Sequence, residues 1–235
     1  MINIDTVYQK VLALANKEQR GYITPQEFNL LAGRAQQEIF DTYFHDVKTA
    51  YRKPQNQMGS AYNENEVLAE KLSPFKGSST IAQVANDSTL DISGIAALYY
   101  VNSITNKDLG VQVTELTTEE VLYTENNPLT KATTNRPVYT RDGSDIMNLF
   151  PTPTIATNYE VNYYKYPTTP NWAYVVIKGK ALYNSNLATN FTLHESEEEP
   201  LVTRILGLAG IVIQKPGLLE VAMANEANLK QSQND

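Results

Sequence analysis

Apolar residues recur every three or four positions near the start of the chain, and this spacing predicts two helices. Asn3 is placed to cap the first helix. The second begins at a capping box formed by Thr24 and Glu27, with Pro25 at the first helical position, and extends to about Lys53. Its apolar stripe comprises Phe28, Leu31, Ala35, Ile39 and Tyr43. We therefore expect an αα-hairpin at the N-terminus.

From Ser79 onward the periodicity changes from helical to alternating, which is typical of strands. Strand-like runs span 98–104 and 159–166, and the segment 141–144 is a tight turn between two further strands. The segment 117–122 interrupts the strands and is typical of a capped short helix. Alternating and apolar runs then continue as far as Ile177. The pattern predicts a central, mainly antiparallel β domain.

Helical spacing returns near the end of the chain. Ser196 is placed to cap a helix whose first turn carries Glu197, Glu198 and Glu199. After a break at Pro216, a further amphipathic segment predicts a last helix.

Together these elements predict an α+β fold. The N-terminal αα-hairpin and the C-terminal helices are expected to form a helical bundle, with the central, mainly antiparallel β domain attached. The expected parts are an N-terminal helical part at 1–72, a β-rich domain at 79–193, and C-terminal helices at 195–235 that pack on the N-terminal hairpin.

The composition of the chain argues against several classes of function. The 235 residues carry a formal charge of −7 and a pI near 5.0, which argues against a protein that grips nucleic acid phosphates. The chain contains no cysteine, so disulfides and thiolate chemistry are excluded. It also lacks a long apolar run and a signal-like start, so we expect no membrane partner and synthesis in the cytoplasm.

Candidate catalytic residues are sparse, and we expect no enzyme, cofactor or metal site. A catalytic histidine would act as a base on a nearby nucleophile, but the chain has only two histidines, His45 and His194, and no Gly-x-Ser-x-Gly nucleophile elbow. The acidic run 195–199 is explained by a helix N-terminus better than by a cation site. Likewise, 141–145 is a hairpin turn rather than an EF-hand loop. A carboxylate-based glycosidase stays open as an alternative, because its paired acids need no local motif.

The chain has 15 tyrosines, concentrated between Tyr99 and Tyr183. Such rings form strand cores, anchor interfaces or line sugar-binding grooves, and we rank these roles in that order. The tyrosines and the polar tract 184–190 therefore support an alternative function as a carbohydrate- or receptor-binding tail module.

Three segments carry a resemblance to a known family. They are 22–29 around the capping box, the 136–151 hairpin with its Arg-Pro-Val-Tyr start, and 163–172, which reads Tyr-Tyr-Lys-Tyr-Pro and ends at Trp172. These segments resemble head-to-tail connector proteins of short-tailed, crAss-like bacteriophages.

The resemblance implies a structural virion protein at the head-tail junction. Its subunits would form a ring of about twelve copies below the portal protein. Further ring or tail proteins would lie next to it, and double-stranded DNA would pass through the lumen without sequence-specific binding. On this reading we expect Phe28, Tyr43 and Tyr51 near the helical packing. We expect the remaining site residues near a subunit or partner contact: Tyr164, Tyr166 and Trp172.

Overall fold

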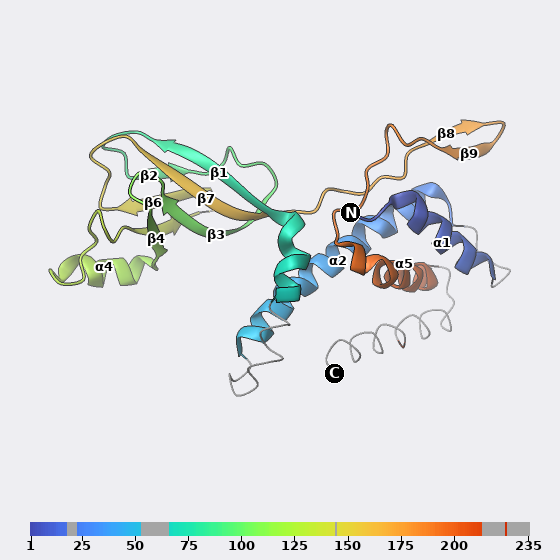
Figure 1. The fold of residues 1–235 in the computed structure, drawn as a ribbon, viewed down its shortest axis with the longest axis horizontal. Helices are drawn as coiled ribbons and strands as arrows, with labels where there is room; N and C mark the ends of the chain where they lie inside the picture. The colour runs from blue at the N-terminus through green and yellow to red at the C-terminus, as the bar shows by residue number, and fades with distance from the viewer. Residues whose placement is uncertain (18–22, 53–65, 144, 213–223, 225–235) are drawn as a thin grey trace. The chain divides into compact units, whose positions relative to one another are not determined.

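The computed structural model describes residues 1–17, 23–52, 66–143, 145–212 and 224. The chain divides into two compact units (Figure 1). We call Met1–Pro74 together with Pro167–Asp235 the helical unit, and Phe75–Tyr166 the sheet unit. The sheet unit is thus inserted between the two halves of the helical unit.

The sheet unit is built on seven strands, which pair in the order β1-β7-β3-β4-β5-β6-β2. The pairing is antiparallel except between β4 and β5, which are parallel and are connected through helix α4 (Thr118–Asn126). The outermost strands β1 and β2 also approach each other, so the sheet is nearly closed. The strands are β1 (Lys76–Gln83), β2 (Thr89–Asp91), β3 (Leu98–Asn106), β4 (Val111–Glu115), β5 (Val138–Asp142), β6 (Ile146–Phe150) and β7 (Thr157–Lys165).

Alternation along the strands places one face of the sheet on a hydrophobic core. In β7, Tyr159, Val161 and Tyr163 are buried, whereas the residues between them are polar or half-exposed. Residues from the other strands complete the same cluster: Leu90, Ile92, Ile95, Val101, Ile104, Val113, Tyr139, Met147 and Leu149. The sheet unit therefore has a core of its own.

The helical unit contains α1 (Ile4–Lys17), α2 (Pro25–Arg52), a helical stretch at 66–72, and α5 (Glu198–Val212). The short 3-10 helix η1 (Ser73–Phe75) ends this part and leads into β1. A second 3-10 helix, η2 (Glu195–Glu197), precedes α5, and α5 packs on both α1 and α2. The same unit carries a two-stranded hairpin of β8 (Tyr174–Ile177) and β9 (Lys180–Tyr183).

The start signals of α1, α2 and α4 are confirmed. The Oγ1 of Thr24 accepts a hydrogen bond from the backbone N–H of Glu27, and the Glu27 carboxylate accepts one from the Thr24 N–H. The Asn3 side chain accepts from the N–H groups of Asp5 and Thr6 at the start of α1. The short capped helix predicted at 117–122 is confirmed as α4, and the structure shows that a second capping box, formed by Thr117 and Glu120, opens it.

The predicted fold class, a helical bundle with a central β domain, is wrong. The structure is a mixed α/β fold in which a large, nearly closed seven-stranded sheet with its own core forms one unit. Residues 167–193, expected within the β domain, belong instead to the helical unit. There Trp172, Phe191 and Leu193 are buried. Apolar periodicity shows which face of an element is buried but not which other element covers it. For the segment 167–193, the elements that cover its apolar side chains are helices and not the sheet.

A buried glutamine fixes that extended segment to α2. The side-chain amide of Gln36 donates to the carbonyl of Thr168 at 2.8 Å, and its oxygen accepts from the N–H of Thr192 at 3.0 Å. Because backbone groups at depth need partners, this one side chain holds both ends of the segment. The last helix predicted after Pro216 lies outside the described residues.

Candidate functional site

Trp172 is the centre of an anchor at the base of the β8–β9 hairpin. The side chain is only 3% exposed, and its indole N–H donates to Oδ1 of Asp5 at 2.9 Å. The ring of Tyr8 lies 4.4 Å from the indole, measured between centroids. Tyr8 also contacts Phe28 of α2 at 4.7 Å, so the anchor is continuous with the helical core.

Asn29 of α2 holds the backbone of the same residue. Its Oδ1 accepts from the Trp172 N–H at 2.8 Å, and its Nδ2 donates to the Trp172 carbonyl at 3.3 Å and to the Asn171 side chain at 3.1 Å. Both the ring and the main chain of Trp172 are therefore fixed where the hairpin leaves the helices.

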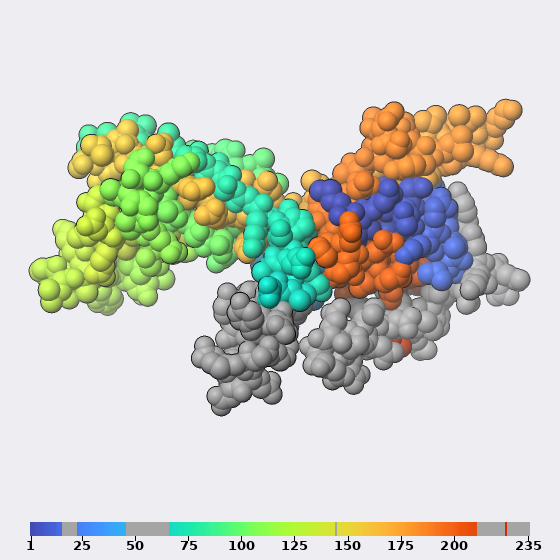
Figure 2. Space-filling view, viewed as in Figure 1, coloured from blue at the N-terminus to red at the C-terminus, as the bar shows by residue number. Residues whose placement is uncertain are grey.

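The hairpin begins on this anchor. The rings of Tyr174 and Tyr183, a cross-strand pair, stack on Trp172 at 5.8 and 5.6 Å. At the far end, Lys178 and Gly179 have positive φ angles of 50° and 76°, as a two-residue type I′ turn requires. The hairpin projects from the helices of its own unit, and its tip stands clear of them in Figures 1 and 2.

Beyond the anchor, apolar side chains of the hairpin are exposed to solvent. Val175, Ile177 and Leu182 are 49%, 52% and 50% exposed, and Val176 is exposed as well. An isolated two-stranded ribbon is marginally stable in water, and contiguous exposed apolar surface is typical of protein contact sites. The arrangement is therefore suited to binding a partner, and we take the hairpin as the candidate functional site.

A second feature is a hollow of about 420 Å³ on the outer side of the sheet unit. Tyr164 lines it together with Asn162 and Ser103, and Nδ2 of Asn162 donates to Oγ of Ser103 at 3.3 Å. Amide and hydroxyl groups next to a tyrosine ring could hydrogen-bond and stack on a sugar. The other lining residues are Lys76, Gly77, Ser78, Asn102 and Tyr163.

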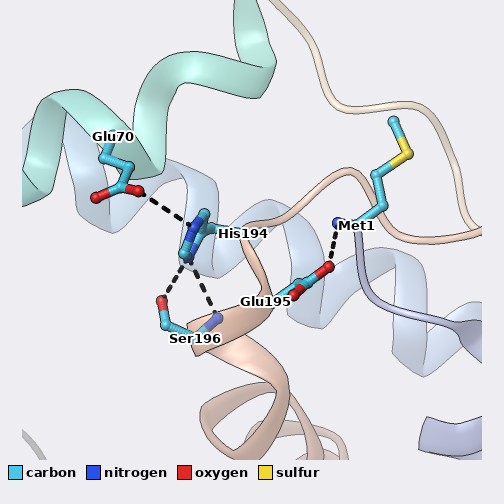
Figure 3. Close-up of polar contacts among 5 residues, drawn as sticks. All are labelled: Met1, Glu70, His194, Glu195 and Ser196. Carbon is cyan, nitrogen blue, oxygen red and sulfur yellow. Dashed lines mark hydrogen bonds and ion pairs between the residues drawn. The ribbon is translucent and has the colours of Figure 1, made fainter.

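His194 contacts Ser196 and lies near Glu70, a set that superficially resembles a catalytic triad (Figure 3). However, Nδ1 of His194 accepts from the backbone N–H of Ser196 at 3.3 Å and lies 3.0 Å from its Oγ, which is the geometry of a helix cap. The Nε2 atom is 3.9 Å from the Glu70 carboxylate, beyond hydrogen-bond range. His194 thus caps the 3-10 helix η2, which contains Ser196 and leads into α5, so the prediction that Ser196 is the cap is wrong.

The acidic run that follows is engaged by cationic groups. Glu195 lies 3.4 Å from the amino group of Met1, as Figure 3 shows, and Glu197 pairs with Lys71 at 2.9 Å. Lys10 of α1 pairs with Glu198 at 2.7 Å and with Glu199. Hydrogen bonds to these two carboxylates raise the pKa of the Lys10 ammonium. Within the described ranges, no three His, Cys, Asp or Glu side chains form a cluster able to hold a metal ion.

The residues predicted near contacts do not form one site. Phe28 and Tyr43 are buried in α2, and the side chain of Tyr51, also in α2, lies outside the described part. Tyr166 is exposed at the end of the sheet unit, where its ring and that of Tyr99 form an edge-to-face pair. Trp172 is the one that belongs to the candidate site, as its buried base. That Tyr164, Tyr166 and Trp172 lie near a subunit or partner contact stays a prediction, as does the place of Phe28, Tyr43 and Tyr51 near the helical packing.

Sequence reasoning missed the groups that build the anchor, namely Asp5, Tyr8 and Asn29, because they come from two helices far from residue 172. It also missed β9, predicting a single strand ending at Ile177. The signal was present: Gly179 sits between two short apolar runs, which is the spacing of a hairpin.

The sequence matches no protein-family model and no curated protein. Among the helices that the structure describes, none is both long and apolar enough to cross a membrane.

Proposed function

We propose that this chain is a structural virion protein, a head-to-tail connector subunit that assembles into a ring of about twelve copies. The ring would lie below the portal protein, contact further ring or tail proteins, and form part of the DNA conduit. The proposal begins from the resemblance of three segments to connectors of crAss-like phages. The net charge of −7 is compatible with a conduit that does not retain DNA.

The projecting hairpin is the observation that carries this proposal. Its apolar residues are exposed while its base is fixed by Trp172, Asp5 and Asn29. A rigid base lowers the entropy that is lost when an exposed arm docks, so such an arm is suited to assembly.

The test is the particle mass of the purified chain by mass photometry, alone and after mixing with the portal ring encoded by the same genome. We expect a complex that gains about twelve copies, as closed cyclic assembly requires. A monomer under both conditions would contradict a connector directly below the portal. The variant Val175→Asp, which charges the exposed side of the hairpin, should lower the assembled fraction, whereas Leu187→Asp, at an exposed apolar position outside the hairpin, should not.

A second candidate, a carbohydrate- or receptor-binding tail module, is favoured by the hollow beside Tyr164 and Asn162. This function predicts specific, micromolar or tighter recognition on a glycan array, lost in the variant Asn162→Ala. Loss of binding in that variant together with unchanged assembly would place recognition, rather than ring formation, at the sheet. An array without specific binding would leave the connector as the supported function.

A further inference from the structure

One face of the hairpin is an apolar strip with a single cation. The strand register pairs Val175 with Leu182 and Ile177 with Lys180, and directly paired residues point to the same side of a sheet. We call these four residues the hairpin face. Tyr174 and Tyr183, which stack on Trp172, are the pair next to Val175 and Leu182, so their side chains point to the other side of the hairpin. The hairpin face is thus the side turned away from the anchor.

A second exposed apolar face lies on α4 of the sheet unit. Glu119, Leu122, Tyr123 and Asn126 recur at the spacing that places side chains on one side of a helix, and we call them the α4 face. Leu122 and Tyr123 are 62% and 79% exposed. Val121, on the other side, is buried and holds the helix on its unit. The α4 face is therefore presented outward on a helix fixed from behind.

The two faces are complementary in charge. The segment 167–193 contains Lys178 and Lys180 and no acidic residue, whereas 115–131 contains four glutamates and one lysine. Each face combines large apolar side chains with one charged side chain. On the hairpin face this is the cationic Lys180, and on the α4 face it is the anionic Glu119. An apolar contact with an opposite charge at its edge gains burial and fixes orientation.

We propose that the hairpin face of one copy docks on the α4 face of a second copy, with Lys180 paired to Glu119. The inference rests on the proposed function and specifies the contact by which its subunits join. The two faces are different surfaces of one chain, so the contact is heterologous and can repeat from copy to copy until a ring closes.

Cysteine crosslinking tests this contact directly, because the chain contains no cysteine of its own. Leu182→Cys and Leu122→Cys are purified as separate single-cysteine variants, mixed with or without the portal ring, and oxidised. Only a disulfide between two copies can form in this design. We expect a linked dimer in the mixture at a yield about tenfold above that of either variant alone. Leu187→Cys and Ile155→Cys, at exposed apolar positions outside both faces, serve as matched controls.

A charge exchange tests the orientation. In the Leu182→Cys chain, Lys180→Glu places two carboxylates together and should lower the linked fraction about tenfold. Adding Glu119→Lys to the Leu122→Cys partner should restore it. Neither change touches the anchor, so the circular dichroism of each variant should match that of the parent.

The outcomes separate this inference from the proposed function. A ring in mass photometry without the specific crosslink, or with equal yield from the control positions, overturns the docking contact and leaves the connector. The specific crosslink without a closed ring keeps the contact and contradicts the connector. Linkage that survives Lys180→Glu unchanged overturns the charge pair.

Discussion

At the scale of single residues, the capping glutamates make stability depend on pH. Hydrogen bonds from the backbone and side chain of Thr117 lower the pKa of Glu120 below its ordinary value of 4.5, and Thr24 does the same to Glu27. The charged form is thus favoured in the folded state. The stabilisation is present above pH 4.5 and is lost as the pH falls through the lowered pKa.

We therefore predict that Glu120→Gln reduces the loss of stability on acidification below about pH 4.5. Urea denaturation at a series of pH values measures the free energy of unfolding. Glu119→Gln, on the same helical turn but outside the capping box, is the matched control. In this variant the free energy of unfolding should depend on pH as it does in the parent. If the free energy of unfolding of Glu120→Gln fell with pH as steeply as that of the parent, the prediction would be contradicted.

The ion pair of Lys71 and Glu197 gives a second prediction at this scale. The two side chains are only 15% and 8% exposed, and their charged atoms lie 2.9 Å apart. Removing one partner leaves a charge with little access to water, so Glu197→Gln should lower the free energy of unfolding by about 3 kcal/mol. The double variant Lys71→Met with Glu197→Met should recover most of that loss. Equal stability of the parent and the single variant would show that the pair contributes nothing.

At the scale of elements, the hairpin depends on α2 through Asn29. Asn29→Ala leaves the N–H of Trp172 without its partner, at a cost of about 1–3 kcal/mol. Trp172 is the only tryptophan in the chain, so its fluorescence reports on the anchor alone. We predict that acrylamide quenches the Trp172 fluorescence more strongly in Asn29→Ala than in the parent. In Leu30→Ala, at a neighbouring exposed position, quenching should equal that of the parent. Unchanged quenching in Asn29→Ala would mean that ring stacking alone holds the anchor.

The elements also show what sequence could predict. The capping boxes at Thr24 and Thr117 were predictable because donor and acceptor are three residues apart. The side-chain alternation in β7 was predictable for the same local reason. The anchor was not, because Asp5 and Asn29 are separated from Trp172 by more than 140 residues. A segment with strand-like apolar residues was therefore placed in the sheet, although its partners are helices.

At the scale of the whole molecule, the sheet unit has the properties of an independent domain. Lys76, at its start, pairs with Tyr164, near its end, so its two termini are adjacent in the sheet. We predict that residues 75–166 fold alone with a single cooperative urea transition. Ile104→Ala, within its core, should shift this transition to lower urea, whereas Val84→Ala, at an exposed site, should not. A fragment without a cooperative transition would contradict this independence.

The insertion of one unit into the other sets an order of events on the ribosome. All the strands of the sheet have been translated once residue 165 emerges, so this unit can fold early. Helices α1 and α2 emerge first but lack Trp172, Phe191 and α5 until residue 212 has been made. The parts of their apolar faces that these later residues cover stay exposed while the sheet forms. The nascent N-terminal helices thus expose apolar surface during translation, which is the kind of surface that chaperones bind.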